Sequence, residues 1–147
     1  MSTGKRPIVH VLLTFDVEEA EYGGQLDLKT QRVVGALKEF GPPPATFFLD
    51  GAATLTYPNS VRLLAENGFE LALHSDYHPD VGARHHRKMD FGSQDSKTQI
   101  SRIQNAISMI RSVIPDFDPR GFRSPNWSWN EDLYFSLNKL GFLYDSS

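Results

Sequence analysis

A regular alternation of short apolar runs with amphipathic segments is the feature that most constrains the fold. Residues 8–15, 45–51 and 69–73 are rich in β-branched, leucine and phenylalanine side chains at odd and even positions alike, as in strands buried on both faces. Segments 26–40 and 59–67 lie between these runs and space their apolar residues as a helix does. The alternation predicts parallel strands with right-handed crossovers, in an open doubly wound sheet or in a β/α barrel.

The pattern of strands and helices continues to the end of the sequence. Asn59 or Ser60 is the expected N-cap of the helix at 59–67, and Gly68 is its expected stop. The clearest helix is predicted over 96–114, where isoleucines recur every three or four residues and form one buried stripe. A short strand, a helix and the start of a further strand are predicted at 121–125, 130–141 and 142–147.

Composition narrows the chemistry that the chain can perform. A length of 147 residues suits one domain, and a formal net charge of -3 without a long basic run disfavours nucleic acid and anionic membranes as partners. No run reaches the roughly 18 to 20 apolar residues that cross a bilayer, and early acids interrupt the N-terminal run, so we expect no signal peptide and a cytoplasmic location by default. Because the chain has no cysteine, histidine and carboxylate side chains must hold any metal.

Polar side chains follow the predicted strands at the points where those strands end. These residues are Asp16, Glu18, Asp50, His74, His78 and Arg123. In parallel α/β folds the carboxyl ends of the strands share one edge, and chemistry gathers there. The sequence therefore predicts one functional site at this edge.

His74 and His78 are four residues apart, directly after the third predicted strand. Two imidazoles and one carboxylate suit zinc or a neighbouring transition metal, and they leave a coordination position open for water or substrate. The spacing alone is weak evidence, because two exposed histidines in a turn would look the same. It is not the helical H-E-x-x-H pattern of zinc proteases, since Ser75 stands where that pattern has glutamate.

Three motifs, each at a predicted strand end, are more specific than this spacing. LTFDVEE, LALHSDYHP and GFRSPNW resemble, in this order, the first three motifs of the polysaccharide deacetylase family, also called carbohydrate esterase family 4 or the NodB-type fold. LGFLYDSS resembles the family strand after the third motif, so the resemblance covers the chain from Ile8 onward. It implies a distorted β/α barrel and metal-dependent hydrolysis of an acetamide, usually on N-acetylglucosamine units.

Carried over to this sequence, the resemblance implies a centre for Zn²⁺ or another divalent transition metal. It makes His74 and His78 metal ligands, and it makes Asp16 the general base that takes a proton from the attacking water. The family's first motif usually has two adjacent aspartates, whereas Val17 follows Asp16 here. By similarity to family branches whose acids are two residues apart, Glu18 becomes the third ligand. The alternative is that Glu18 is a solvated loop acid.

The third motif implies further roles. Arg123 would hold the carboxylate of the general base, and Pro125 would fix the turn that follows. A backbone N–H at Asn126, where the family often has tyrosine, would serve as oxyanion donor, and the side-chain difference is tolerable because the donor is main chain. Trp127, together with Trp129, would form a wall for sugar stacking, or both would pack in the core.

Two other groups of polar residues have weaker cases. His10 falls within the first predicted strand, about 20 Å from the acid at its far end, and we expect a structural role for it. Residues 79–95 have no periodicity and predict a long loop. The basic cluster from His85 to Lys88 within this loop either contacts substrate as a lid or, as we expect, is a solvated charged segment.

The chain is short for a barrel. A full β/α barrel needs upward of about 200 residues, and about five parallel strands are predicted here. We therefore expect residues 1–147 to be a single domain that is an incomplete, N-terminal portion of the distorted barrel. The family's later motifs, including a general-acid histidine, have no counterpart after Arg123. The alternative is a shortened member that self-associates through an uncovered sheet edge.

Three functions compete at this stage. The leading one is a metal-dependent hydrolase of non-peptide carbon–nitrogen bonds that deacetylates N-acetylated sugar units of a polysaccharide. The second is a hydrolase of small cyclic amides or ureides, which the absence of a sugar-stacking platform would favour. The third is a non-catalytic metal- or partner-binding remnant of the family, which the missing general acid would favour.

Overall fold

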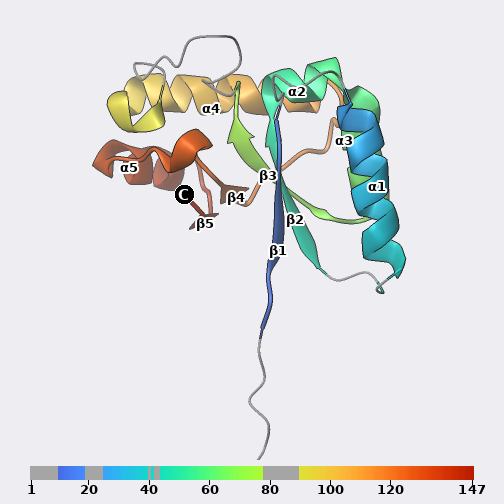
Figure 1. The fold of residues 1–147 in the computed structure, drawn as a ribbon. Coiled ribbons are helices and arrows are strands. Elements are labelled where there is room, and N and C mark those ends of the chain that lie inside the picture. The colour runs from blue at the N-terminus through green and yellow to red at the C-terminus, as the bar shows by residue number, and fades with distance from the viewer. Residues whose placement is uncertain (1–9, 19–24, 40, 42–43, 78–89) are drawn as a thin grey trace, which may run out of the picture.

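Strands and helices alternate along the described part of the chain (Figure 1). The structure is a computed structural model, and it describes residues 10–18, 25–39, 41, 44–77 and 90–147. Its elements, in chain order, are β1 (Leu13–Val17), α1 (Leu26–Glu39), β2 (Ala45–Asp50), α2 (Gly51–Thr56), α3 (Pro58–Glu66), β3 (Glu70–Ser75), the 3₁₀ helix η2 (Phe91–Ser93), α4 (Ser96–Arg111), β4 (Gly121–Phe122), the 3₁₀ helix η3 (Pro125–Trp127), α5 (Glu131–Lys139) and β5 (Tyr144–Asp145). Among these described helices, none has the length and apolar character needed to cross a membrane.

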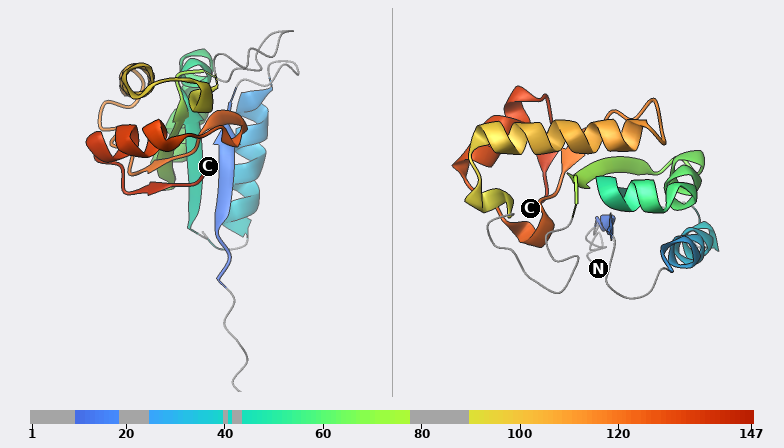
Figure 2. Two further views of the ribbon diagram at one scale, coloured as in Figure 1. Left: turned by 90° about the vertical axis from the view of Figure 1, so that its left-hand side faces the viewer. Right: turned by 90° about the horizontal axis from the view of Figure 1, so that it is seen from above.

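The strands form one parallel sheet whose spatial order is the chain order, β1-β2-β3-β4-β5. Seen from above, α5, α4, α3 and α1 form an arc around one side of this sheet (Figure 2). Sequential strand order with helices outside is the arrangement of a β/α barrel, whereas a doubly wound sheet reverses its order and carries helices on both faces. The expected five-stranded portion of a barrel is therefore confirmed, and the doubly wound alternative is wrong.

The hydrophobic core lies between the sheet and the helices. Leu73 of β3 and Phe122 of β4 belong to the same buried cluster as Ile103 and Ile110 of α4, and all four are fully buried. This confirms the predicted isoleucine stripe, but α4 ends at Arg111, three residues before the predicted end at 114. Arg102 of α4 is also buried, which the apolar stripe did not predict.

Strand β1 is shorter and more exposed than its apolar run suggests. The described strand begins at Leu13, and the preceding Val11 and Leu12 are 71% and 86% exposed. Among the described strands β1 pairs with β2 alone, so it forms an edge of the described sheet and one of its sides is uncovered. The prediction of burial on both faces is therefore wrong, as is the placement of His10 inside the strand, since His10 is exposed ahead of it.

A polar network ties together the starts of three strands. Tyr144 of β5 donates its hydroxyl to the carboxylate of Glu70 in β3 at 2.8 Å, and Thr46 of β2 donates to the same carboxylate at 2.6 Å. A Cβ atom on Gly121 of β4 would lie 2.0 Å from the Tyr144 ring, so only glycine lets the ring lie there. A cavity of about 680 Å³ lies beside this network, between β1, β2 and β5.

The start of α3 differs from the prediction, while its end agrees. The helix begins at Pro58, and its N-cap, Tyr57, makes no side-chain capping bond, so the assignment of Asn59 or Ser60 as N-cap is wrong. Proline suits the first turn because its missing N–H would have no helical partner there. Gly68 has a φ of 72° and follows the helix as predicted.

Asp50 begins a helix that the sequence did not predict. It is the N-cap of α2, and its Oδ1 accepts the backbone N–H of Ala53 at 2.9 Å. Its Oδ2 is buried without a hydrogen-bond partner among the described residues. Burial raises the pKa of Asp50 from 3.8 to about 7, against the lowering effects of the Ala53 N–H and of His74.

The raised pKa of Asp50 predicts a pH-dependent stability. The folded chain keeps this proton up to about pH 7, whereas the unfolded chain loses it near pH 4, so the free energy of unfolding falls between these values. The fall is at most about 1.4 kcal/mol per pH unit. Asp50→Asn keeps the capping oxygen and removes the titration, so we expect a flatter profile in urea unfolding of chelator-treated protein between pH 5 and pH 8.

Asp95→Asn is the matched control for this prediction. Asp95 is the N-cap of α4, and hydrogen bonds to Thr98 lower its pKa, so its stabilising contribution is lost only as the pH falls below about 4. The Asp95→Asn profile should therefore have the parent slope between pH 5 and pH 8. If Asp50→Asn also keeps the parent slope, the assignment of the buried proton is wrong.

Candidate metal centre

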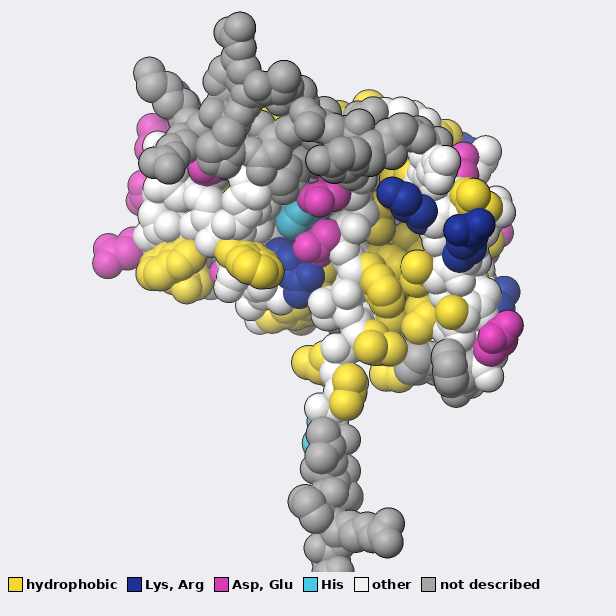
Figure 3. Space-filling model, in the orientation of Figure 1, with side chains coloured by type: hydrophobic (Ala, Val, Ile, Leu, Met, Phe, Trp, Pro, Cys, Tyr) yellow, Lys and Arg dark blue, Asp and Glu magenta, His cyan; other side chains and the backbone are white. Residues whose placement is uncertain are grey.

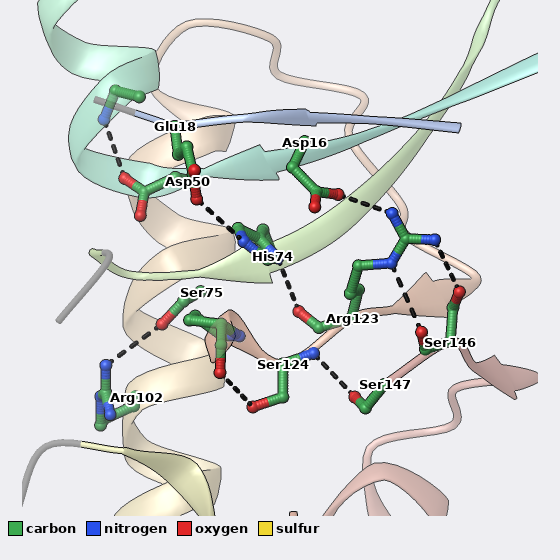
Figure 4. Close-up of polar contacts among 12 residues, drawn as sticks. Asp16, Glu18, Asp50, His74, Ser75, Arg102, Arg123, Ser124, Ser146 and Ser147 are labelled. Atoms are coloured by element: carbon green, nitrogen blue, oxygen red, sulfur yellow. Dashed lines mark hydrogen bonds and ion pairs between the residues drawn. The ribbon is translucent and has the colours of Figure 1, made fainter. Parts of the chain in front are cut away.

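The carboxyl ends of three strands bring the predicted residues to one edge of the sheet (Figure 4). Asp16 lies near the end of β1, and Glu18 directly follows that strand. His74 lies in β3, and Arg123 directly follows β4. Figure 3 shows acidic, basic and histidine side chains gathered on this face, beside hydrophobic ones.

His74 is oriented by contacts on both sides of its ring. It is 2% exposed, and its Nδ1 lies 2.8 Å from the backbone carbonyl oxygen of Arg123, so we assign the proton to Nδ1, which donates it. The other ring nitrogen, Nε2, lies 3.3 Å from Oε2 of Glu18. In this tautomer the lone pair of Nε2 faces the Glu18 carboxylate, and the two acceptors repel one another. A cation that binds both atoms makes the contact favourable.

The separation of these two donor atoms fits a tetrahedral metal site. Zinc binds imidazole nitrogen and carboxylate oxygen at about 2.0–2.2 Å, and a tetrahedral angle between two such bonds places the donors about 3.4 Å apart. The 3.3 Å between Nε2 of His74 and Oε2 of Glu18 agrees with that value. A hydrogen bond from the opposite ring nitrogen to a backbone carbonyl is also what orients a metal-binding histidine.

The other predicted ligand, His78, lies outside the described residues, as does the basic cluster from His85 to Lys88. Within the part of the chain that the structure describes, no group of three histidine, cysteine, aspartate or glutamate side chains could hold a metal. A third protein ligand beside Glu18 and His74 therefore stays a prediction.

Arg123 holds the carboxylate of Asp16. Its Nη1 donates to Oδ1 of Asp16 at 2.7 Å, and its Nη2 donates to the hydroxyls of Thr14 and Ser146 at 3.1 and 2.8 Å. The guanidinium also lies over the ring of Phe48, 4.1 Å from the ring centroid. These contacts fix the arginine, while the side chain of Asp16 is 33% exposed and within reach of solvent.

The turn after Arg123 has an unusual backbone. Pro125 is buried, whereas Asn126 and Trp127 are exposed. Both exposed residues have φ in the left-handed region, at 56° and 49°. Asparagine adopts this conformation more readily than most residues, which is a physical reason for its presence in this turn.

Two tryptophans lie on the surface beside the edge. Trp127 is 70% exposed and Trp129 is 55% exposed, so the alternative that they pack in the core is wrong. With Thr14, Arg123 and Ser146 they line a cavity of about 520 Å³. The cavity places aromatic faces next to the Asp16–Arg123 pair.

A buried ion pair near this edge has no counterpart among the sequence predictions. Nη2 of Arg102, on α4, lies 2.7 Å from Oδ1 of Asp76, and both side chains are buried. Asp76 comes two residues after His74. Arg102 lies off the isoleucine stripe of the predicted helix, so the helical periodicity gave no signal for its burial. A charged side chain is rarely buried unless it is paired, and here the partner is Asp76.

Comparison with protein families agrees with these features. The polysaccharide deacetylase family model matches residues 3–144. The chitooligosaccharide deacetylase of Sinorhizobium fredii (strain NBRC 101917 / NGR234) is 32% identical over 131 residues, which cover 89% of this chain and 53% of that protein. The chain thus spans about half the length of this relative.

Solved structures share the fold. A Mycobacterium smegmatis protein assigned to the polysaccharide deacetylases has a TM-score of 0.75 and 28% identity, over 91% of this chain and 49% of that one. A CE4 family pseudoenzyme from Bacillus anthracis has a TM-score of 0.68 and 17% identity, over 91% and 42% of the two chains, which shows a common fold alone. Together, the family match and the shared fold show that this chain belongs to the polysaccharide deacetylase family.

Proposed function

We propose that this chain is a metal-dependent amide hydrolase that removes acetyl groups from N-acetylated sugar units of a polysaccharide. The observation that carries the proposal is the joint placement of Glu18, His74 and the Asp16–Arg123 pair at one edge of the sheet. The family match and the chitooligosaccharide deacetylase relative support the substrate class. In this proposal residues 1–147 act as a single domain that supplies the metal-binding part of the site.

Glu18, His74 and His78 would hold the ion, Zn²⁺ or another divalent transition metal. When bound, such an ion polarises an amide carbonyl and lowers the pKa of water at its open position. The chain's own contribution is orientation. The bond from Nδ1 of His74 to the Arg123 carbonyl keeps Nε2 aimed at Glu18, and the two donor atoms already have the separation that a shared tetrahedral ion requires.

Asp16 would act as the general base. Its carboxylate accepts a proton from the water that attacks the amide carbonyl carbon. Because Arg123 bonds Oδ1, we assign the proton to Oδ2. The backbone N–H of Asn126, in the turn that Pro125 begins, would donate to the carbonyl oxygen as negative charge develops there. The carbon–nitrogen bond then breaks, the leaving nitrogen takes up a proton from solvent, and the products are acetate and an amine.

The exposed tryptophans favour a sugar polymer over a small cyclic amide. Trp127 and Trp129 are exposed and line the same cavity as Arg123, the partner of the proposed base, and a substrate ring can cover them. A non-catalytic role is the second candidate, because a pseudoenzyme shares this fold. Self-association through β1 and β5, which are the edges of the described sheet, is a further proposal.

The metal site predicts the zinc content of the purified chain. We expect about one zinc ion per chain. Glu18→Gln and His74→Ala should each weaken zinc binding by more than the roughly 10- to 100-fold that follows loss of an outer-shell partner. Inductively coupled plasma mass spectrometry after dialysis measures the bound metal. His10→Ala changes an exposed histidine outside the site and should keep the parent content. Equal zinc in all these proteins would contradict the assignment.

If Asp16 is the general base, a variant without its carboxylate should bind metal but hydrolyse substrate much more slowly. Asp16→Asn should keep zinc but slow acetate release from a chitooligosaccharide by about 10²- to 10⁴-fold, because the proton acceptor is lost. Asp118→Asn changes a carboxylate whose side chain is 90% exposed, and it should retain the parent rate. An active Asp16→Asn protein would remove this residue from the mechanism. A zinc-loaded parent that hydrolyses neither chitooligosaccharides nor cyclic imides would support the non-catalytic candidate.

If Trp127 and Trp129 stack on the sugar, removal of one of these side chains should weaken substrate binding. Trp127→Ala should weaken chitooligosaccharide binding about two- to tenfold by loss of ring contact, as measured by isothermal titration calorimetry. Phe135→Ala removes an aromatic side chain that is 57% exposed but does not line the cavity, and it should bind as the parent does. The small-substrate alternative would be favoured by two results together. The parent would bind no chitooligosaccharide, and Trp127→Ala would hydrolyse a cyclic imide as fast as the parent does.

A further inference from the structure

Arg102 is a buried arginine of α4 whose side chain reaches the turn after β3. It is 8% exposed, and its Nε and Nη2 donate to Oδ1 of Asp76 at 3.0 and 2.7 Å. Nη2 also donates to the hydroxyl of Ser75 at 3.1 Å (Figure 4). The guanidinium is therefore bonded to Ser75, the last residue of β3, and to Asp76, the first residue of the turn that follows.

Other side chains enclose the rest of the guanidinium. Its central carbon lies 4.7 Å from the ring centroid of Tyr77 and 4.4 Å from that of Phe91. Its Nη1 donates to Oε1 of Gln94 at 3.2 Å. Two aromatic rings pack against the guanidinium and its nitrogens are hydrogen-bonded, so this side chain has a defined position.

The pair of Arg102 and Asp76 contributes geometry more than stability. Removing both charges from water offsets much of their attraction, and apolar residues of similar size are often as stable or more stable in their place. An arginine and a carboxylate in direct contact nevertheless hold one another at a defined distance and angle.

The part that Arg102 fixes is the segment between the two predicted histidine ligands. Asp76 lies two residues after His74 and two before His78. Its Oδ1 also accepts the backbone N–H of Tyr77 at 3.0 Å, so the guanidinium and the turn share one oxygen atom. Arg102 is thereby tied to the backbone that leads from one ligand toward the other.

We propose that Arg102 is a positioning residue for the metal centre. It fixes the turn at Asp76, directly after the strand that carries His74 and two residues before the predicted ligand His78. The inference rests on the metal-dependent function proposed above and adds a residue of α4 that touches neither metal nor substrate. Its effect is on metal affinity, through the turn.

Arg102→Lys tests this role in the whole chain. Lysine keeps a positive charge for Asp76 but lacks the planar fork and the ring contacts of arginine. Zinc affinity of the chelator-stripped protein is measured by competition with a chromogenic chelator, beside urea unfolding of the same sample. We expect about 10- to 100-fold weaker zinc binding. Arg111→Lys is the matched control on the same helix, where the arginine contacts Phe117 and the exposed Asp118, and it should keep the parent affinity.

A double variant separates positioning from stability. Arg102→Met with Asp76→Asn removes both charges, so no unpaired charge is left buried. We expect a free energy of unfolding similar to or above that of the parent, with zinc affinity still lowered about 10- to 100-fold. A merely structural role would not move zinc affinity in a variant that folds this well. If Arg102→Lys does not fold, the double variant decides.

The failures of the two proposals are distinguishable. Folded Arg102 variants with the parent zinc affinity would overturn the positioning role and leave the metal site intact. A parent chain that binds no zinc would overturn the metal-dependent function, and the positioning role with it.

Discussion

The candidate centre depends on contacts of Arg123. The side chain and the backbone carbonyl of this residue join the ends of several strands. Its guanidinium, placed directly after β4, bonds Asp16 of β1 and the hydroxyl of Ser146 directly after β5. Its backbone carbonyl accepts from Nδ1 of His74 in β3. These partners are far apart in the sequence, and the parallel sheet brings them within hydrogen-bond distance. The bond from Nδ1 of His74 to this carbonyl orients the imidazole ring, and Nε2 therefore points at the carboxylate of Glu18.

Residues whose position depends on local sequence were predictable, and those that depend on distant partners were not. Asp16 and His74 could be placed at one edge because each belongs to the end of an apolar run, which is a local pattern. The cap that Asp50 forms on α2 is an exception, because an aspartate that bonds the N–H three residues on is a local N-cap signal that the prediction overlooked. The exposure of β1 depends on its place at the edge of the described sheet, which no local pattern shows. The bond between Arg102 and Asp76 spans 26 residues of sequence and exists because α4 packs against the turn after β3.

Two polar networks hold the strands at opposite ends. Tyr144, Glu70 and Thr46 join the starts of β5, β3 and β2, while Arg123 joins the ends of β1, β3 and β4. The inner face between these networks is open in the described sheet and includes a cavity of about 680 Å³. Nε2 of His74 and Oε2 of Glu18 lie at the strand ends that Arg123 joins, 3.3 Å from one another.

The central claim is that Glu18 and His74 bind the same ion. X-ray diffraction at the zinc absorption edge, from crystals of the chain grown with zinc, tests it most directly, because anomalous scattering locates the ion without any assumption about its ligands. We predict one strong peak within about 2.0–2.2 Å of both Nε2 of His74 and a carboxylate oxygen of Glu18. A zinc peak elsewhere in the molecule, or no peak at this edge of the sheet, would contradict the claim.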